Sequence, residues 1–478
     1  MSLFKNKIIF LIFVNVIFLL SYSFLLKKYL IDIVNQNPDI IDKTYYSAIF
    51  SNLEISSVIA IILLILCLVF KLQFDAFTKV ITSNGRFVWL FIIINIILQV
   101  VIIFSIKTIQ ISDSIYYISH ATRLFETGSY INEFGNKTAF WPVGLPIMIF
   151  LVFYIFGKSI VILQFINIIF NSALIFVLYK IFQNYLSNRQ MVVFLSFYTF
   201  NPNNLFNVNP IMTELPFVFF LWLSVLIYQR KRKYHLALIG ILCALMLYFR
   251  PIGLFLPLIF FIDMWNNHSF YISVKKTLLI FSVMIILLSP WIFRNYLVFD
   301  ALVIGSTNGG YNFLMGNHKG ASGGINFDFN YNIKNPNEAE ESKIAFHKGV
   351  ISILEHPFEA IERIPKKIFY SYIRGDNSIT WSLKKTENYI PVIMLSMIFY
   401  LTNLIFYSIV FFSLFSLIIL RKDISKERIF VTIAIYFLLI IIFFVGNERY
   451  LLPIMPIHIY YATKLFFKGN DTNIILEK

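Results

Sequence analysis

The sequence predicts an all-α, polytopic membrane protein with about 12 transmembrane helices and further helices in its outer loops. Of its 478 residues, 58% are hydrophobic and 14% are charged, and the mean hydropathy is +0.75. A soluble domain has about 25% charged residues, whereas apolar runs of membrane-spanning length recur along this chain.

The basic residues indicate orientation in a membrane rather than a nucleic-acid partner. The net charge is +15, but Lys and Arg occur in short clusters between the apolar runs, which is the positive-inside pattern. Cys67 and Cys243 both lie within apolar runs, so they indicate neither a disulfide nor a metal site. We therefore expect membrane lipid, and no nucleic acid, among the partners.

Residues 1–86 are expected to add two transmembrane helices before the main module. Lys5 and Lys7 precede an apolar run that ends at Leu26 without a small-residue cleavage site, so a retained helix is expected rather than a signal peptide. A second run follows at about 53–70, and the basic residues after it place the next loop in the cytoplasm.

The rest of the chain divides into a membrane module (87–300), an extracytoplasmic loop (301–389) and C-terminal transmembrane helices with a short cytoplasmic tail (390–478). If the basic clusters at 230–233, 275–276 and 421–428 are all cytoplasmic, one run between 141 and 206 does not cross the membrane. The apolar runs of this part are 87–106, 141–156, 159–182, 191–206, 211–228, 234–249, 251–264, 278–293, 390–420, 429–445 and 451–467.

An outer loop at 107–141 carries the candidate catalytic residue, Asp113. Asp113, Tyr117 and Leu124 recur at helical spacing before Gly128, so a short surface helix that ends at Gly128 is expected. An acid fixed where a membrane enzyme meets water is a natural general base for a substrate hydroxyl. The alternative is a solvated loop acid beside a helix. Tyr117 is expected to face the substrate.

Glu214 and Arg250 stand at the outer ends of apolar runs. An acid at the start of a helix is also favoured by the helix dipole, so helix capping is the alternative to a substrate-facing role for Glu214. Arg250 precedes Pro251, which cannot continue a helix. Its side chain either reaches the lipid headgroups or binds a phosphate with its planar fork.

A second group of candidate binding residues follows the run at 278–293. An Arg at the outer interface beside a Gly-rich turn offers charge and free backbone N–H groups to a phosphate or a sugar. The alternative is an ordinary loop. The candidates are Arg294, Asn295, Asn308, Gly309, Gly310 and Asn312.

The loop 301–389 is the only sizeable hydrophilic stretch of the sequence. Residues 338–372 have the pattern of an amphipathic helix with basic residues at one end, so we expect a helix pair on the membrane surface that covers the active site. His318, His347 and His356 lack the spacing of metal ligands.

Taken in order, these elements resemble the GT-C glycosyltransferases. The pattern D-x-x-x-Y-x-x-x-A-x-x-L-x-x-x-G-x-Y begins at Asp113, P-W-x-x-R-N-Y occupies 290–296 before an N-G-G-x-N turn, and R-Y-x-x-P begins at Arg449. The resemblance covers about residues 87–467. It is closest to the bacterial relatives of protein O-mannosyltransferases and of lipid A aminoarabinose transferases.

The resemblance implies a polyprenyl-phosphate sugar donor, a reaction on the outer face of the membrane, and Asp113 as the catalytic acid of the loop. It adds Arg449 and Tyr450 to the residues expected to bind the donor. The family often has a second acid in the outer loop, where this chain has Trp141 and Pro142. No cofactor is certain from the sequence, and a divalent metal ion is compatible with the resemblance.

The expected function is transfer of a sugar from a polyprenyl phosphate to an extracytoplasmic glycan, lipid or protein, by direct inverting displacement in a bacterial inner membrane. Two alternatives are a lipid-linked-sugar transporter (flippase) and a polysaccharide polymerase or ligase. A transporter tends to have internal repeats and polar residues near mid-membrane, whereas the polar residues singled out here cluster at outer helix ends.

Overall fold

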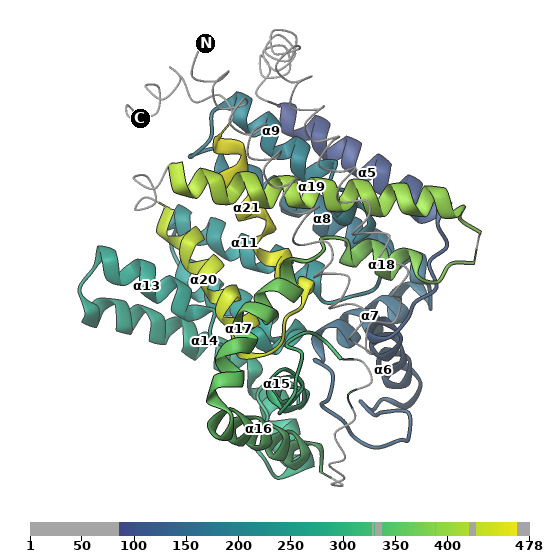
Figure 1. The fold of residues 1–478 in the computed structure, drawn as a ribbon. Coiled ribbons are helices and arrows are strands. Elements are labelled where there is room, and N and C mark those ends of the chain that lie inside the picture. Colours follow the sequence, from purple (N-terminus) through teal and green to yellow (C-terminus); the bar gives the residue numbers. More distant parts are fainter. Residues whose placement is uncertain (1–85, 327–328, 330–336, 388, 420–426, 466–478) are drawn as a thin grey trace.

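The computed structural model describes residues 86–326, 329, 337–387, 389–419 and 427–465. Every regular element in this part of the chain is a helix, with isolated β-bridges between loops, so the predicted all-α class is confirmed (Figure 1). The two helices expected before residue 86 lie outside the described residues, as does Cys67.

Four described helices are long and apolar enough to cross a membrane, which agrees with the predicted membrane class. They are α5 (Phe87–Ser105), α8 (Ile160–Phe182), α14 (Phe270–Phe299) and α19 (Val392–Ile419). Three apolar helices are shorter, namely α7 (Gly144–Phe156), α12 (His235–Phe249) and α20 (Arg428–Phe443). The described helices therefore do not establish the expected number of about 12 crossings.

The chain between residues 141 and 206 contains one helix of spanning length, α8. Its N-terminus is capped by Ser159, whose side chain accepts a hydrogen bond from the Ile162 N–H. The run at 191–206 is broken into α9 (Asn188–Thr199) and α10 (Pro202–Phe206). The break falls at Asn201, which caps α10, and Pro202, which starts it.

The core joins helices from both ends of the described chain. Trp222 of α11 (Glu214–Arg230) is fully buried, and its ring packs against Phe182 of α8 and Phe430 of α20. Its indole N–H donates to the carbonyl of Pro453, in the 3-10 helix η5 (Leu452–Ile454). The short helix α21 (Met455–Lys464) adds Tyr460, which stacks on Phe182. The helices after residue 390 thus share one hydrophobic core with the membrane module.

Close packing between α12 and α14 depends on Gly240. A Cβ atom at this position would lie 2.8 Å from the carbonyl oxygen of Ile280, so only glycine lets the two backbones approach this closely. α14 extends beyond the predicted run at 278–293 in both directions and continues through Pro290. Between α12 and α14, the chain forms the 3-10 helix η2 (Pro251–Gly253) and α13 (Pro257–Asn267).

The outer-loop helices gather at one end of the molecule, the lower end in Figure 1. The predicted surface helix is present as α6 (Asp113–Thr127), and Gly128 ends it with a left-handed φ of 69°. The predicted helix pair at 338–372 is present as α16 (Glu338–Glu355) and α17 (Pro357–Tyr372). The short helix α15 (Gly309–Asn317) belongs to this end, whereas α18 (Asn377–Leu383) lies at mid-height in Figure 1, below α19.

Candidate active site

Arg449 lies at the meeting point of α6, α11 and the segment after α20. It belongs to the 3-10 helix η4 (Glu448–Tyr450). Its Nη1 lies 2.6 Å from Asp113 Oδ2, and its Nε donates to Glu214 Oε1. Asp113 and Glu214 are the first residues of α6 and α11, where a carboxylate is favoured by the helix dipole. One guanidinium therefore joins two acids that are far apart in the sequence.

Arg250 completes this group of four charged side chains, which we call the Asp113 cluster (Asp113, Glu214, Arg250 and Arg449). Arg250 follows α12 in extended conformation, and its Nη1 donates to Glu214 Oε1 at 2.6 Å. Glu214 thus accepts from both arginines, while its Oε2 is buried without a hydrogen-bond partner among the described residues. Four of the residues predicted at helix ends are brought together.

Exposure distinguishes the two acids. The Asp113 side chain is 17% exposed, whereas that of Glu214 is 3% exposed. Glu214 is fixed between two arginines, as a buried carboxylate must be if its charge is to be retained. Asp113 uses Oδ2 for Arg449, and its Oδ1 has a long contact, 3.5 Å, with the Ser112 hydroxyl. Asp113 is the acid of the cluster that a bound molecule can reach.

Aromatic rings enclose the cluster. The Arg449 guanidinium lies over the Trp381 ring at 5.7 Å, and that of Arg250 lies over the Tyr450 ring at 5.8 Å, both within range of a cation–π interaction. Tyr117, one turn along α6 from Asp113, is buried and packs edge-on against Trp141. These rings limit access of water and so strengthen the charge interactions of the cluster.

The protonation states of two cluster residues follow from their surroundings. Burial alone would lower the pKa of Arg449, but the charges of Glu214 and Asp113 raise it well above its usual value. Burial, and then the charge of Asp113, raises the pKa of Tyr117. Arg449 is therefore a permanent cation and Tyr117 a neutral phenol.

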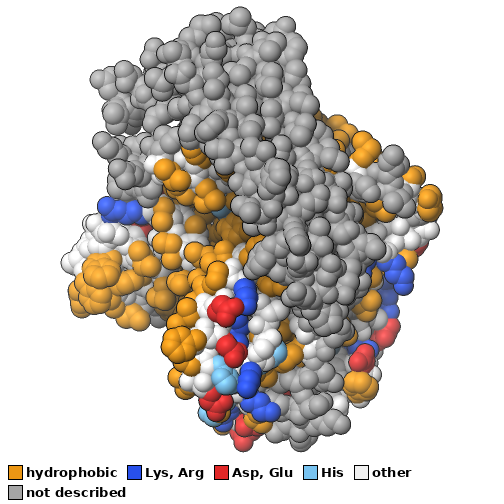
Figure 2. All heavy atoms as spheres, viewed as in Figure 1, with side chains coloured by type: hydrophobic (Ala, Val, Ile, Leu, Met, Phe, Trp, Pro, Cys, Tyr) orange, Lys and Arg blue, Asp and Glu red, His pale blue; other side chains and the backbone are white. Residues whose placement is uncertain are grey.

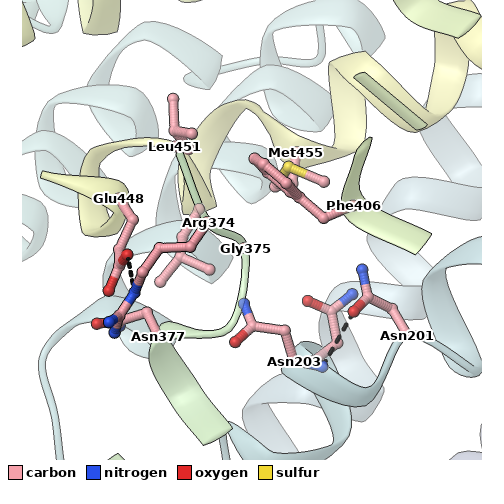
Figure 3. Close-up of a pocket in the computed structure, with 11 residues that line it drawn as sticks. Asn201, Asn203, Arg374, Gly375, Asn377, Phe406, Glu448, Leu451 and Met455 are labelled. Carbon is pink, nitrogen blue, oxygen red and sulfur yellow. Dashed lines mark hydrogen bonds and ion pairs between the residues drawn. The ribbon is translucent and has the colours of Figure 1, made fainter. Parts of the chain in front are cut away.

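A second polar layer adjoins Arg449 and consists of Arg374, Asp376 and Glu448. Its centre is Arg374. Its Nε pairs with Glu448 Oε2 at 2.6 Å and with Asp376 Oδ1 at 3.0 Å. Figure 3 shows Arg374 and Glu448 beside a small cavity whose floor carries the amide side chains of Asn203 and Asn377. Burial raises the pKa of Glu448 to about 7, against the opposing effect of Arg374. The predicted residues did not include this layer, although the adjacent R-G-D at 374–376 is a charged signal within the hydrophilic loop.

Arg294 and Asn295 lie in a different group of contacts, which holds the outer loop 107–141. The two Nη atoms of Arg294 donate to the carbonyls of Thr138 (2.8 Å) and Tyr130 (3.1 Å), and its guanidinium lies 5.0 Å from the Trp291 ring centre. The Asn295 side chain donates to the Val303 carbonyl. In this structure both side chains bind backbone rather than the Asp113 cluster.

The Gly-rich turn forms the N-terminus of α15 and packs against α16. Asn308 accepts a hydrogen bond from the Ser306 hydroxyl, and Asn312 is bonded through its backbone to Asn308 within α15. The Gly310 N–H donates to Ser342 Oγ, and a Cβ atom on Gly310 would lie 1.8 Å from the Ser342 carbonyl oxygen. Gly309 has open space around its Cβ position. The turn is therefore bonded within itself and to α16.

The described residues do not form a cluster typical of a metal site. They contain no group of three or more His, Cys, Asp and Glu side chains that could hold a metal ion. Glu126, which precedes Trp141 and Pro142 in the outer loop, pairs with Lys158 on the surface.

Comparisons with known proteins gave a distant structural similarity. The chain is similar to the archaeal oligosaccharyltransferase AglB from Archaeoglobus fulgidus in complex with an inhibitory peptide and a dolichol-phosphate, with 12% identity, a TM-score of 0.46 and 80% of this chain covered. It is also similar to the A. fulgidus oligosaccharyltransferase tethered by a disulfide bond to an acceptor peptide containing the NVT sequon, with 12% identity, a TM-score of 0.47 and 80% coverage. This chain spans about half of each of those chains, 50% and 49%.

Sequence comparison matched no protein-family model and no curated protein. Similarities of this size leave the chemistry of the site to be inferred from its own residues.

Proposed function

We propose that this protein is a membrane glycosyltransferase of the GT-C type. It moves a sugar from a polyprenyl-phosphate donor to an acceptor outside the cytoplasm, in a bacterial inner membrane. The observation that carries the proposal is the Asp113 cluster, in which a partly exposed acid pairs with Arg449 and a buried acid pairs with both Arg449 and Arg250. The order of the motifs in the sequence supports the same class.

In the proposed reaction, Asp113 acts as the general base. Its Oδ1 takes the proton of the acceptor hydroxyl or amine as the acceptor atom bonds to the anomeric carbon of the sugar. The bond from that carbon to the phosphate oxygen breaks, and its electron pair remains on the polyprenyl phosphate. The displacement is direct and inverts the anomeric centre. A base of this kind contributes about 10²–10⁴ in rate.

Arg250 and Arg449 are proposed to hold the phosphate and to stabilise the charge that grows on it. A guanidinium has five N–H donors, and the hydrogen bond of Arg250 to Glu214 uses one of them. Preorganised cations of this kind often make the largest contribution to catalysis. Glu214 keeps both arginines in place, and its unpartnered Oε2 is a candidate acceptor for a substrate hydroxyl.

The helix directions support an outward-facing site. α11 runs from Glu214 to Arg230 and α20 starts at Arg428 and leads toward Arg449, so the basic residues lie at the opposite helix ends from the Asp113 cluster. Lys and Arg are enriched in cytoplasmic loops, which supports a cluster on the outer face of the membrane.

Sugar transfer in membranes tests the proposal. A panel of labelled polyprenyl-phosphate sugars is supplied to membranes that contain wild type, Asp113→Asn or the control Asp300→Asn. Asp300 is an exposed acid at the end of α14. Transfer from one donor by wild type and the control, and its loss in Asp113→Asn at equal protein level, would support the proposal. Equal transfer by all three would remove Asp113 from the chemistry, and no transfer from any donor would favour a polymerase or a transporter.

A further inference from the structure

The buried face of α17 is polar, unlike that of a helix packed on a hydrophobic core. Its buried residues are Arg363, Lys367 and Ser371, at intervals of four. Phe358 and Ile361, in contrast, are 85% and 63% exposed. Charged and histidine side chains gather over α16 and α17 in Figure 2, beside exposed apolar surface. Burying this polar face is costly unless its groups are hydrogen-bonded, so the face must have specific partners.

Arg363 donates to the carbonyls of His318 and Asn317. Lys367 and Ser371 have partners between the last turn of α20 and η4. Lys367 Nζ donates to the Ile442 carbonyl at 2.8 Å, and the Asn447 N–H donates to Ser371 Oγ at 3.0 Å. Just beyond the end of α17, Arg374 pairs with Glu448 (Figure 3). The contacts follow the same order along both segments.

The segment is also confined by close packing at Gly446. A Cβ atom there would lie 2.4 Å from the Lys367 carbonyl oxygen. On its other side, the Gly446 N–H donates to the Gly323 carbonyl at 2.7 Å. The backbone that leads to Arg449 is therefore held on both sides.

Arg449 lies two residues after Asn447, the residue whose N–H is bonded to Ser371. The Asn447 side chain caps η4 by accepting a hydrogen bond from the Arg449 N–H at 3.0 Å, while the Asn447 N–H is bonded to Ser371. A movement of Asn447 would therefore be passed to Arg449 and to its contacts with Asp113 and Glu214.

We propose that α17 is a positioning element for the active site, in which Ser371, with Lys367 and Arg374, fixes the segment 442–448 and thereby sets Arg449 against Asp113. The effect of this positioning on catalysis rests on the proposed function. The fixing of the segment 442–448 by α17 does not. Ser371 is a positioning residue, since it acts through Asn447 and Arg449.

The test uses Ser371→Ala, which removes one acceptor at little cost in volume, in the purified full chain. The control is Ser352→Ala in α16, since the buried Ser352 hydroxyl has no hydrogen-bond partner among the described residues. Hydrogen exchange measured by mass spectrometry reports on the 443–451 peptides. We expect faster exchange of these peptides in Ser371→Ala and no change in Ser352→Ala. Unchanged exchange in Ser371→Ala would overturn the inference, whatever the enzyme's activity.

A double-mutant cycle with Arg449→Lys provides the catalytic readout. Ser371→Ala should lower kcat about threefold to tenfold in the wild-type background, the range for one lost neutral hydrogen bond. In the Arg449→Lys background it should have little further effect. Independent, multiplicative effects would overturn the positioning role. If exchange increases but wild type transfers no sugar, the positioning inference stands and the proposed function fails.

Discussion

Arg449 Nη1 lies 2.6 Å from Asp113 Oδ2, although the two residues are 336 positions apart in the sequence. The same guanidinium donates through Nε to Glu214. The proposed general base and one proposed phosphate ligand are therefore parts of a single network. Loss of Arg449 leaves Asp113 without its partner in the cluster, and an unpaired buried charge is strongly destabilising. Loss of Asp113 or Arg250, in contrast, leaves each remaining charge with one partner. At Arg449, a variant that keeps the charge is consequently the most informative.

Arg449→Lys should lower sugar transfer about tenfold or more while the protein still folds. Lysine keeps the charge, but it lacks the planar fork with which arginine binds two groups at once. The comparison is kcat and donor KM at matched protein level in membranes. A lysine variant with wild-type kinetics would show that the double contact with Asp113 and Glu214 is unimportant.

Arg250 and Arg294 should respond differently to the same substitution. Arg250→Gln should mainly reduce transfer, because Arg250 belongs to the Asp113 cluster. Arg294→Gln should mainly lower the thermal midpoint, because it removes donors from the carbonyls of Tyr130 and Thr138, at about 1–3 kcal/mol for an unsatisfied buried group. Sugar transfer and the thermal midpoint are measured in both variants. The opposite assignment of effects would place the phosphate at Arg294.

The two glycines of the Gly-rich turn provide a matched pair. Gly310→Ala should destabilise the protein by about 1–3 kcal/mol, the usual cost of overpacking, because the new Cβ would collide with the Ser342 carbonyl. Gly309→Ala should be tolerated, since that Cβ would meet open space. Thermal midpoints of both variants test this. Loss of transfer in both, with stability unchanged, would instead indicate a phosphate-binding turn.

Lys367 should make stability depend on pH. Burial, and then the charge of Arg363, lowers the pKa of Lys367 to about 7, whereas the unfolded chain keeps a value of about 10.4. Between these values the unfolded state binds more protons, so stability rises with pH, by at most about 1.4 kcal/mol per pH unit.

The thermal midpoint of wild type should therefore rise between pH 7 and pH 9, and this rise should be smaller in Lys367→Met. The comparison concerns the two slopes, because loss of the Lys367 hydrogen bonds also changes the absolute midpoint. Equal slopes in the two proteins would mean that Lys367 keeps its proton over this range.

Much of the site could be predicted because its residues occupy helix ends. The spacing of Asp113, Tyr117 and Gly128 predicts α6, and the acid or arginine at the end of an apolar run identifies Glu214 and Arg250. The pairing of these residues could not be predicted, because the contact of Arg449 with Asp113 depends on where η4 meets the start of α6. The separation of Arg294 from the cluster also depends on how segments distant in the sequence pack, so it could not be predicted either.

Two features of the fold had no clear signal in the sequence. The polar face of α17 is buried although its composition is that of a surface helix, because Lys367 and Ser371 find backbone partners between the last turn of α20 and η4. The break between α9 and α10 depends on a single Asn-Pro pair within an apolar run. Hydropathy averages over such a break and predicts one helix.

The most direct test of the central claim, that Asp113 takes the acceptor proton, is the single-turnover rate of sugar transfer by Asp113→Asn at saturating donor and acceptor. The amide keeps the shape of the side chain but cannot act as a base. We predict that the rate constant falls by about 10²–10⁴ while the donor still binds to the variant. A rate constant close to that of wild type would contradict the account.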